Sequence, residues 1–288
     1  MAITLKPLSE MKSKILILGK GFIGDRLQEA IGAASSGAMV YNFSDAQACV
    51  RRFSPKIIIN CIGITGKNNV DDCEAVKDDA LLANSFVPII LAEVALRNKI
   101  KLVHISSGCI FHYDYSKDSP INEEVVPDYF ELFYSRTKIY AERALDVLAK
   151  KYPILIARIR VPLDFRSHPK NILEKLIRYK KVIDIPNSVT YIPDFIRALQ
   201  HLLRIDARGI YNIVNKGTLR YPELLEVYKR YVPDFKYRVI KLNELKLTRT
   251  NLILSTRKLE RTGFKTRRIE DVYDECVRKY LEDSKGRR

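Results

Sequence analysis

The chain has 288 residues, of which 47% are hydrophobic and 29% are charged, and its formal net charge is +16. This composition is typical of a globular protein with a sizeable core, and it excludes an intrinsically disordered chain. Residues 1–14 contain no apolar run long enough for a signal peptide, and no later segment approaches the roughly 20 apolar residues of a membrane span. We therefore expect a cytoplasmic protein that makes no membrane contact.

The five cysteines and four histidines form neither a C-x-x-C pair nor a metal-ligand spacing. Free thiols are therefore expected, without a disulfide framework or a bound metal. The positive charge is concentrated in the last third, where residues 204–288 contain 22 Lys and Arg against 12 Asp and Glu. Because these charges are interleaved with acidic and apolar residues at helical spacing, we favour solvated helix faces over a nucleic-acid-binding surface.

Short apolar runs alternate with helical patterns over the first 160 residues. In chain order we predict strand 14–19, helix 22–31, a weak strand 38–41, a helix from about residue 45, strand 56–60, helix 78–98, strand 100–105, helix 130–150 and strand 153–158. Alternation of this kind is typical of the α/β class, with a doubly wound parallel sheet of the Rossmann type.

The regular alternation ends after Pro162, where loops rich in Pro, Asn and Ser separate shorter elements. We expect residues 1–160 to form a dinucleotide-binding domain that also carries the catalytic residues. Residues 161–288 are expected to form a smaller, partly discontinuous substrate-binding region. The apolar run at 209–214 predicts a further strand, so residues 191–214 should return to the main sheet.

A glycine-rich loop joins the first predicted strand to the first predicted helix, and it consists of Gly19, Lys20, Gly21, Phe22, Ile23 and Gly24. Its glycines allow a tight turn, a close approach of the backbone to phosphate, and close packing of the helix that follows. We therefore predict that these residues bind a nicotinamide dinucleotide. The weak second strand leads to Asn42-Phe43-Ser44 and not to an acid, and Lys20 can meet a 2′-phosphate, which favours NADP(H) over NAD(H). A solvated loop charge is a nearly equal explanation of Lys20.

Tyr134 and Lys138 lie four residues apart at the start of a predicted helix, so they share one face. A neighbouring ammonium stabilises a phenolate, which makes such a tyrosine suitable as a general acid for a ketone reduction. Ser107 follows a buried strand, where the sheet opens to ligand, and its hydroxyl is able to orient a carbonyl. A surface pair on an amphipathic helix is the alternative, but the order of these three residues after the glycine loop favours catalysis.

With these residues in place, the chain resembles the extended short-chain dehydrogenase/reductase family. The similarity to its dTDP-4-dehydrorhamnose reductase branch is carried by Val70-Asp-Asp-Cys-Glu74, Ala83-Asn84 and Ile105-Ser-Ser-Gly-Cys-Ile-Phe111. The chain looks closer still to the plant and giant-virus UDP-4-keto-6-deoxyglucose 3,5-epimerase/4-reductases. The segments that carry this second similarity are residues 60–66, 108–111, 158–162, 169–175 and 185–190.

The resemblance implies roles for further residues. Cys109 and Lys175 match the base and the acid of epimerisation, in which protons next to a ketone are removed and returned. A small buried cysteine after a strand is the alternative explanation of Cys109. The resemblance also implies cofactor contacts at Asn60, Gly63 and Asn84, and nucleotide-sugar contacts at Asn171, Asn187, Thr190 and Arg249.

The resulting hypothesis is an NAD(P)H-dependent conversion of an NDP-4-keto-6-deoxyglucose, with UDP as the favoured nucleotide, to NDP-L-rhamnose. It combines 3,5-epimerisation with reduction at C4, and the expected assembly is a homodimer. A reductase that depends on a separate epimerase is the first alternative. A non-catalytic binding or regulatory subunit of the same fold, or a basic RNA-associated scaffold, is the second.

Overall fold

The computed structural model describes residues 12–67, 69–245 and 250–286. The predicted site residue Arg249 lies outside these ranges. The chain divides into two compact units. Unit 1 is built from Met1–Ile110, Val126–Arg158 and Ile196–Tyr211, and unit 2 from Phe111–Val125, Ile159–Phe195 and Asn212–Arg288.

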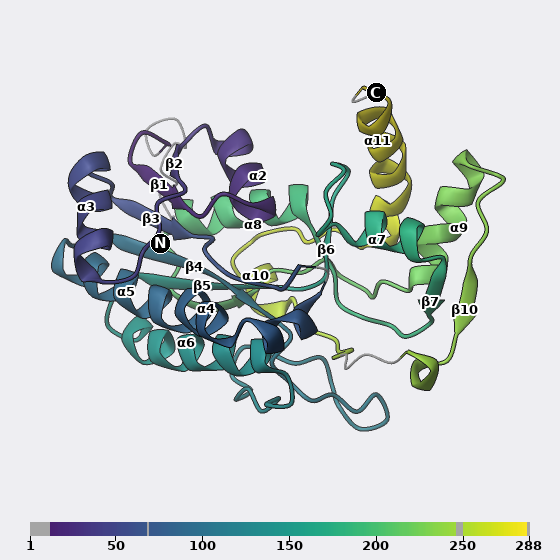
Figure 1. Cartoon of the computed structure of the whole chain (residues 1–288), viewed down its shortest axis with the longest axis horizontal. Helices are drawn as coiled ribbons and strands as arrows, with labels where there is room; N and C mark the ends of the chain where they lie inside the picture. The colour runs from purple at the N-terminus through teal and green to yellow at the C-terminus, as the bar shows by residue number, and fades with distance from the viewer. Residues whose placement is uncertain (1–11, 68, 246–249, 287–288) are drawn as a thin grey trace. The chain divides into compact units, whose positions relative to one another are not determined.

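Unit 1 is organised around a six-stranded sheet in the order β2-β1-β3-β4-β5-β9 (Figure 1). Its strands are β1 (Ile15–Leu18), β2 (Ala34–Ser36), β3 (Ile57–Asn60), β4 (Lys101–Ser107), β5 (Ile154–Ile159) and β9 (Gly209–Asn212). β1 pairs in parallel with both β2 and β3, and β3 pairs in parallel with β4. The expected doubly wound α/β fold is confirmed. The strand order reverses between β1 and β3, and this is where such sheets open to ligand.

Helices cover both faces of this sheet and bury its apolar strands. They are α2 (Phe22–Ile31), α3 (Phe43–Phe53), η1 (Val70–Ala75), α4 (Lys77–Leu81), η2 (Leu82–Phe86), α5 (Val87–Arg97), α6 (Phe133–Ala149) and α8 (Ile192–Arg204). Figure 1 shows α5 and α6 on one side of the sheet and α2 and α8 on the other. The strand residues Leu16, Ile58 and Leu102 are completely buried between these layers, which is why the strands have continuous apolar runs.

The second strand is the main error of the sequence prediction. β2 is Ala34–Ser36, and residues 38–41 form no strand. Asn42 is the N-cap of α3: its side chain accepts a hydrogen bond from the Asp45 amide, while the Asp45 carboxylate accepts one from the Asn42 amide. Because this capping box starts a helix, Asn42–Ser44 do not follow the second strand. Ser36 and Gly37 stand at that position instead.

The segment Lys77–Arg97 is helical throughout, with a π-helical stretch, η2, in its middle. By length and composition alone it is apolar enough to cross a membrane, with a mean hydropathy of 1.6 over its most apolar window. This corrects the expectation that no segment approaches that length. Half of the window is buried inside the protein, and Leu91 and Val94 pack in the core of unit 1. Such burial is typical of a core helix.

Unit 2 contains two small sheets and several helices. β6 (Pro162–Leu163) pairs with β8 (Thr190–Tyr191), and β7 (Lys181–Ile183) pairs with β10 (Arg238–Ile240), both in parallel. The helices are α7 (Ile172–Tyr179), α9 (Tyr221–Tyr231), η3 (Leu242–Glu244), α10 (Arg257–Glu260), η4 (Glu270–Val272) and α11 (Tyr273–Gly286). Apolar side chains of α7, α9 and α11, among them Leu176, Leu225 and Val277, share one core.

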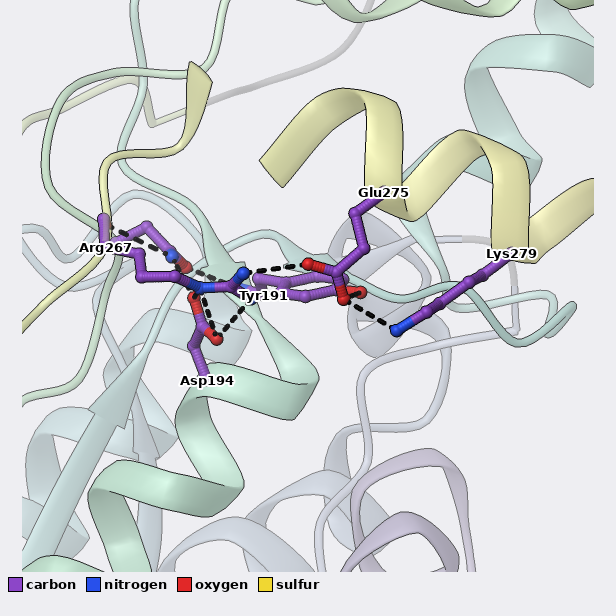
Figure 2. Close-up of polar contacts among 6 residues, drawn as sticks. Tyr191, Asp194, Arg267, Glu275 and Lys279 are labelled. Carbon is purple, nitrogen blue, oxygen red and sulfur yellow. Dashed lines mark hydrogen bonds and ion pairs between the residues drawn. The ribbon is translucent and has the colours of Figure 1, made fainter. Parts of the chain in front are cut away.

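A charged network holds α11 to the junction of β8 and α8, and Figure 2 shows its members. The Arg267 guanidinium donates to both oxygens of Asp194, at 2.7 to 3.1 Å, and to Glu275 at 2.8 Å. It also lies over the ring of Tyr191, 5.6 Å from the centroid. Lys279 donates to Glu275 at 2.8 Å. Asp194, in the first turn of α8, is therefore the ion-pair partner of the half-buried Arg267.

Candidate functional site

The glycine loop has the shape that a dinucleotide requires. Gly19 has a φ of +100°, which favours glycine, and a Cβ on Gly24 would lie 2.0 Å from the Gly19 carbonyl oxygen. A Cβ on Gly21 would meet nothing within 4 Å. Gly21 is exposed and is the N-cap of α2, without a side-chain cap. The N-terminus of α2 is therefore open to an anion, as a pyrophosphate site needs.

The side chain of Lys20, in the glycine loop, lies close to the end of the second strand. The methylene groups of Lys20 lie 3.4 to 3.5 Å from the position of a Cβ on Gly37, directly after β2. Lys20 is exposed, and Phe22 and Ile23 continue into α2 with Phe22 buried. The end of β2 thus carries the Ser36 hydroxyl and lies against the side chain of Lys20, and residues 34–38 contain no carboxylate.

The predicted catalytic residues of unit 1 come from two elements. Ser107 ends β4, and its hydroxyl oxygen accepts a hydrogen bond from the Cys109 amide at 3.1 Å. Tyr134 and Lys138 occupy the first two turns of α6. All three are nearly buried, with 6%, 5% and 4% of their surface exposed. Burial of Tyr134 and Lys138 on one helix face contradicts the alternative of a surface pair.

The predicted cofactor residues gather around Lys138. A Cβ on Gly63 would lie 3.4 Å from Lys138 Nζ and 3.1 Å from Asn84 Oδ1, so both side chains face the Gly63 backbone. Asn84 lies in the π-helical stretch η2 and is fully buried. Its side-chain oxygen accepts a hydrogen bond from the Ile64 amide, and its side-chain nitrogen donates to the Ile64 carbonyl, both at 2.9 Å. The same nitrogen donates to Thr137 Oγ1 at 3.2 Å. π-Helical turns are frequent at functional sites because they re-aim a side chain.

Burial controls the charge of Lys138. Removal from solvent lowers the pKa of Lys138 to about 8, and the carboxylate of Glu142, one turn further on α6, opposes this shift. On β4, burial first and Lys138 second hold the pKa of His104 well below its usual range, so His104 is neutral. The His104 ring lies 3.2 Å from the amide nitrogen of Asn60. Asn60 Oδ1 in turn accepts from the Ile62 amide, which makes it a support of the turn after β3.

Cys109 lies beside the same residues. It is a free thiol of intermediate exposure and packs against the cluster of Cys73, Ala80 and Tyr134. Its carbonyl accepts a hydrogen bond from Ser135 Oγ. Among the described residues, no three His, Cys, Asp or Glu side chains are grouped in a way that would hold a metal ion.

The predicted substrate residues belong to unit 2, and three of them are engaged within it. Asn171 is the N-cap of α7, accepts from the amides of Asp164 and Leu173, and donates to the carbonyls of Asp164 and Arg166. Asn187 and Thr190 both hydrogen-bond Arg160. Each of the three is at most 2% exposed. Lys175, in the first turn of α7, is partly exposed. Pairing of Lys175 with Cys109 stays a prediction.

Sequence reasoning missed a buried group beneath the predicted catalytic residues, which consists of Glu142, Arg158 and Ser106. Arg158 and Glu142 form an ion pair in which 0% and 2% of the side chains are exposed. The available signal was that Glu142 lies four residues after Lys138, and hence on the same helix face. The partner on β5 has no signature in the sequence, because cross-sheet contacts depend on the fold.

Comparison with known proteins decides the family. The sequence model described as the RmlD substrate binding domain matches residues 13–221. The chain belongs to this RmlD family. It is 31% identical over 249 residues to the bifunctional dTDP-4-dehydrorhamnose 3,5-epimerase/dTDP-4-dehydrorhamnose reductase of Arabidopsis thaliana, covering 82% of this chain and 81% of that protein. The resemblance to dTDP-4-dehydrorhamnose reductases seen in the sequence is thereby confirmed.

Two further similarities extend this RmlD assignment. A trifunctional UDP-glucose 4,6-dehydratase/UDP-4-keto-6-deoxy-D-glucose 3,5-epimerase/UDP-4-keto-L-rhamnose-reductase of Arabidopsis thaliana is 33% identical over 236 residues, which cover 78% of this chain. The chain matches only 35% of the length of that relative. The crystal structure of the UDP-rhamnose synthase of Acanthamoeba polyphaga mimivirus has the same fold, with a TM-score of 0.84, 24% identity and coverage of 92% and 98% of the two chains.

Proposed function

We propose that this RmlD-family chain reduces the C4 ketone of a nucleoside-diphosphate 4-keto-6-deoxy sugar with a nicotinamide cofactor. The proposal is carried by the burial of Tyr134 and Lys138 on one face of α6, with Lys138 and Asn84 facing the Gly63 backbone, and by the buried Ser107 at the end of β4. Relatives named as reductases of such sugars support the substrate class. The UDP sugar is favoured because two of the three similar proteins are named for UDP sugars.

Each side chain has a distinct part in this reaction. When bound, the reduced nicotinamide supplies a hydride to C4. The Tyr134 phenol donates the proton that turns the C4 oxygen into a hydroxyl, and Ser107 hydrogen-bonds the same oxygen while its charge grows. The Lys138 ammonium stabilises the phenolate that Tyr134 becomes. Because burial lowers the pKa of Lys138 to about 8, this charge is lost as the pH rises through the alkaline range.

The residues present fit a dinucleotide. The open space beside Gly21 leaves room for a phosphate at the N-terminus of α2. NADP(H) is the favoured form, because the Lys20 side chain lies against Gly37 directly after β2, where a 2′-phosphate is recognised in such folds, and residues 34–38 contain no acid. Titration of NADPH and NADH tests this preference: Lys20→Met should weaken NADPH binding about tenfold and leave NADH binding unchanged. Equal losses for both cofactors would exclude recognition of the 2′-phosphate by Lys20.

We further propose that the same chain inverts C3 and C5 before reduction, with Cys109 as base and Lys175 as acid. Protons at C3 and C5 are acidified by the C4 ketone, and the enolate formed on their removal is stabilised by hydrogen bonds from Tyr134 and Ser107. Support comes from the packing of Cys109 against Tyr134 and from relatives named as epimerases. A reductase served by a separate epimerase remains the alternative, in which Cys109 is a packing residue.

One turnover experiment in D₂O separates these possibilities. The enzyme is incubated with UDP-4-keto-6-deoxyglucose and NADPH alone, and the product is analysed by NMR. UDP-L-rhamnose with deuterium at C3 and C5 would support both activities. Turnover only after addition of a 3,5-epimerase would leave the reductase alone, and no turnover in either case would overturn the proposed function. Cys109→Ser should abolish turnover of the unepimerised ketone and retain turnover of the epimerised one.

A further inference from the structure

A buried carboxylate connects the three elements that carry the candidate site of unit 1. Glu142 lies on α6, and its oxygens accept hydrogen bonds from Arg158 Nε of β5 at 3.0 and 3.1 Å. A second nitrogen of the same guanidinium donates to Glu142 Oε1 at 2.5 Å. From β4, Ser106 Oγ donates to Glu142 Oε2 at 2.8 Å. The carboxylate is therefore held by hydrogen bonds from two strands.

This carboxylate reaches the proposed catalytic residues from two directions. Along α6, Glu142 follows Lys138 by one turn and Tyr134 by two, so all three share a helix face. Along β4, the residue that it holds, Ser106, directly precedes Ser107. One side chain thus influences both the charge next to Tyr134 and the position of the serine hydroxyl.

Stability alone gives a weak reason for this arrangement. Burying an ion pair removes two charges from water, and a well-packed apolar pair of similar volume is often as stable or more stable. The position of the pair next to Lys138 explains why it is charged. A buried ammonium needs a nearby negative charge to stay protonated, and an apolar pair would not supply one.

The other titratable groups near Lys138 are thiols, an imidazole and a phenol, and none of them is a carboxylate. They are Cys61 after β3, Cys73 on η1, His104 on β4 and Tyr134 on α6, with the Arg158 cation beyond Glu142. Burial raises the pKa of Cys61 to about 12, so this thiol is neutral. His104 is neutral as well. Glu142 is the carboxylate of the set.

We propose that Glu142, held by Arg158 and Ser106, is a positioning residue that keeps Lys138 charged and thereby sets the alkaline limit of the proposed reduction. The inference rests on the proposed function for its kinetic consequence. The predicted effect of Glu142 on the charge of Lys138 depends only on the geometry of unit 1.

The direction of the effect follows from the charges. Burial lowers the pKa of Lys138 to about 8 and Glu142 raises it, so removal of the carboxylate lowers this pKa further. If reduction needs the ammonium, the alkaline limb of kcat/KM against pH moves to lower pH. For a unit charge one helical turn away in a protein interior, the shift is about one pH unit or more.

The decisive variants change the carboxylate without leaving a buried cation alone. Glu142→Gln combined with Arg158→Met removes the carboxylate together with the cation that partly offsets it, so it should move the alkaline limb down by less than about one pH unit. Glu142→Asp keeps the charge but withdraws it by one methylene, and it should give a smaller shift in the same direction. If the double variant fails to fold, the Asp variant still decides, because an unchanged limb there would count against the proposal.

Two control variants separate positioning from general damage. Ser106→Ala removes one hydrogen bond and retains both charges, so kcat should fall while the alkaline limb stays in place. Lys101→Met breaks the ion pair of β4 with Asp206, in which the lysine side chain is 8% exposed. It should lower the melting temperature without moving the limb.

A direct titration of Lys138 makes the test independent of turnover. NMR of selectively labelled lysine, assigned with Lys138→Met, reports the Lys138 pKa in the intact chain. A fall of less than about one unit in the double variant, with no fall in Lys101→Met, is expected. An unchanged Lys138 pKa in every folded Glu142 variant would overturn the inference. A lowered pKa in an enzyme that reduces no keto sugar would overturn the proposed function and leave the electrostatic inference standing.

Discussion

The three glycines of the loop after β1 allow packing and cofactor binding to be separated by single substitutions. A Cβ on Gly24 would lie 2.0 Å from the backbone oxygen of Gly19, whereas a Cβ on Gly21 would meet nothing within 4 Å. Gly21 has a φ of 173°, an extended conformation that any residue adopts. Gly24→Ala should therefore damage the folded state, and Gly21→Ala should not.

The magnitudes differ enough to measure. Overpacking costs about 1–3 kcal/mol where side chains can adjust, and the obstacle here is backbone, so we expect the upper end for Gly24→Ala. At about 2–4 °C per kcal/mol in chains of this size, its melting temperature should fall by roughly 6–12 °C. Gly21→Ala costs at most about 1 kcal/mol, as a weaker N-cap, but its methyl group would occupy the space proposed for the pyrophosphate. NADPH should then bind at least about tenfold more weakly, a loss of about 1.4 kcal/mol.

Thermal melts of the free protein and fluorescence titration with NADPH provide both values. The reasoning would be refuted by a Gly24→Ala protein that melts at the temperature of the unmodified chain. It would equally be refuted if Gly21→Ala retained full NADPH affinity, because the open space at the α2 N-terminus would then have no part in cofactor binding.

Three further outcomes are expected. Tyr134→Phe should reduce kcat for ketone reduction by about 10²–10⁴ while NADPH affinity stays within twofold by titration; unchanged kcat would remove Tyr134 as the acid. Arg267→Met should destabilise the chain by about 1–3 kcal/mol in urea unfolding, because Asp194 and Glu275 lose their shared partner. The control Arg268→Met, which breaks an exposed pair with Glu270, should lower the free energy of unfolding by at most about 0.5 kcal/mol. Equal losses of stability in the two variants would contradict the network. Burial raises the pKa of Glu275, but hydrogen bonds from Lys279 and Arg267 outweigh it and lower the pKa to about 2. This depressed pKa adds stability that is complete above about pH 4.5 and is lost as pH falls towards 2, so Glu275→Gln should flatten the acid side of a stability–pH curve.

The sequence predicted most of unit 1 because its signals are local. Short apolar runs, the first of them ending in glycine, identified β1 and β3, and the helical pattern gave the bounds of α2 correctly. The strand at residues 38–41 was wrong because its apolar residues lead into the capping box of α3, while the actual β2 is the short segment Ala34-Ser-Ser36. Such a strand forms because β1 offers it backbone partners, and nothing in its own composition indicates this.

The residues of the candidate site were also predictable where their signals are local. Spacing alone placed Tyr134 and Lys138 on one helix face, and strand position alone placed Ser107 at an open edge of the sheet. The burial that lowers the pKa of Lys138, the turn of η2 that brings Asn84 to it, and the ion pair of Glu142 with Arg158 depend on contacts between distant segments. Thus the sequence by itself determined most elements of unit 1 and the chemical groups that they carry. Only the tertiary structure decided which of these groups lose their water and meet, because desolvation and charge pairing are properties of packed neighbours and not of residues taken singly.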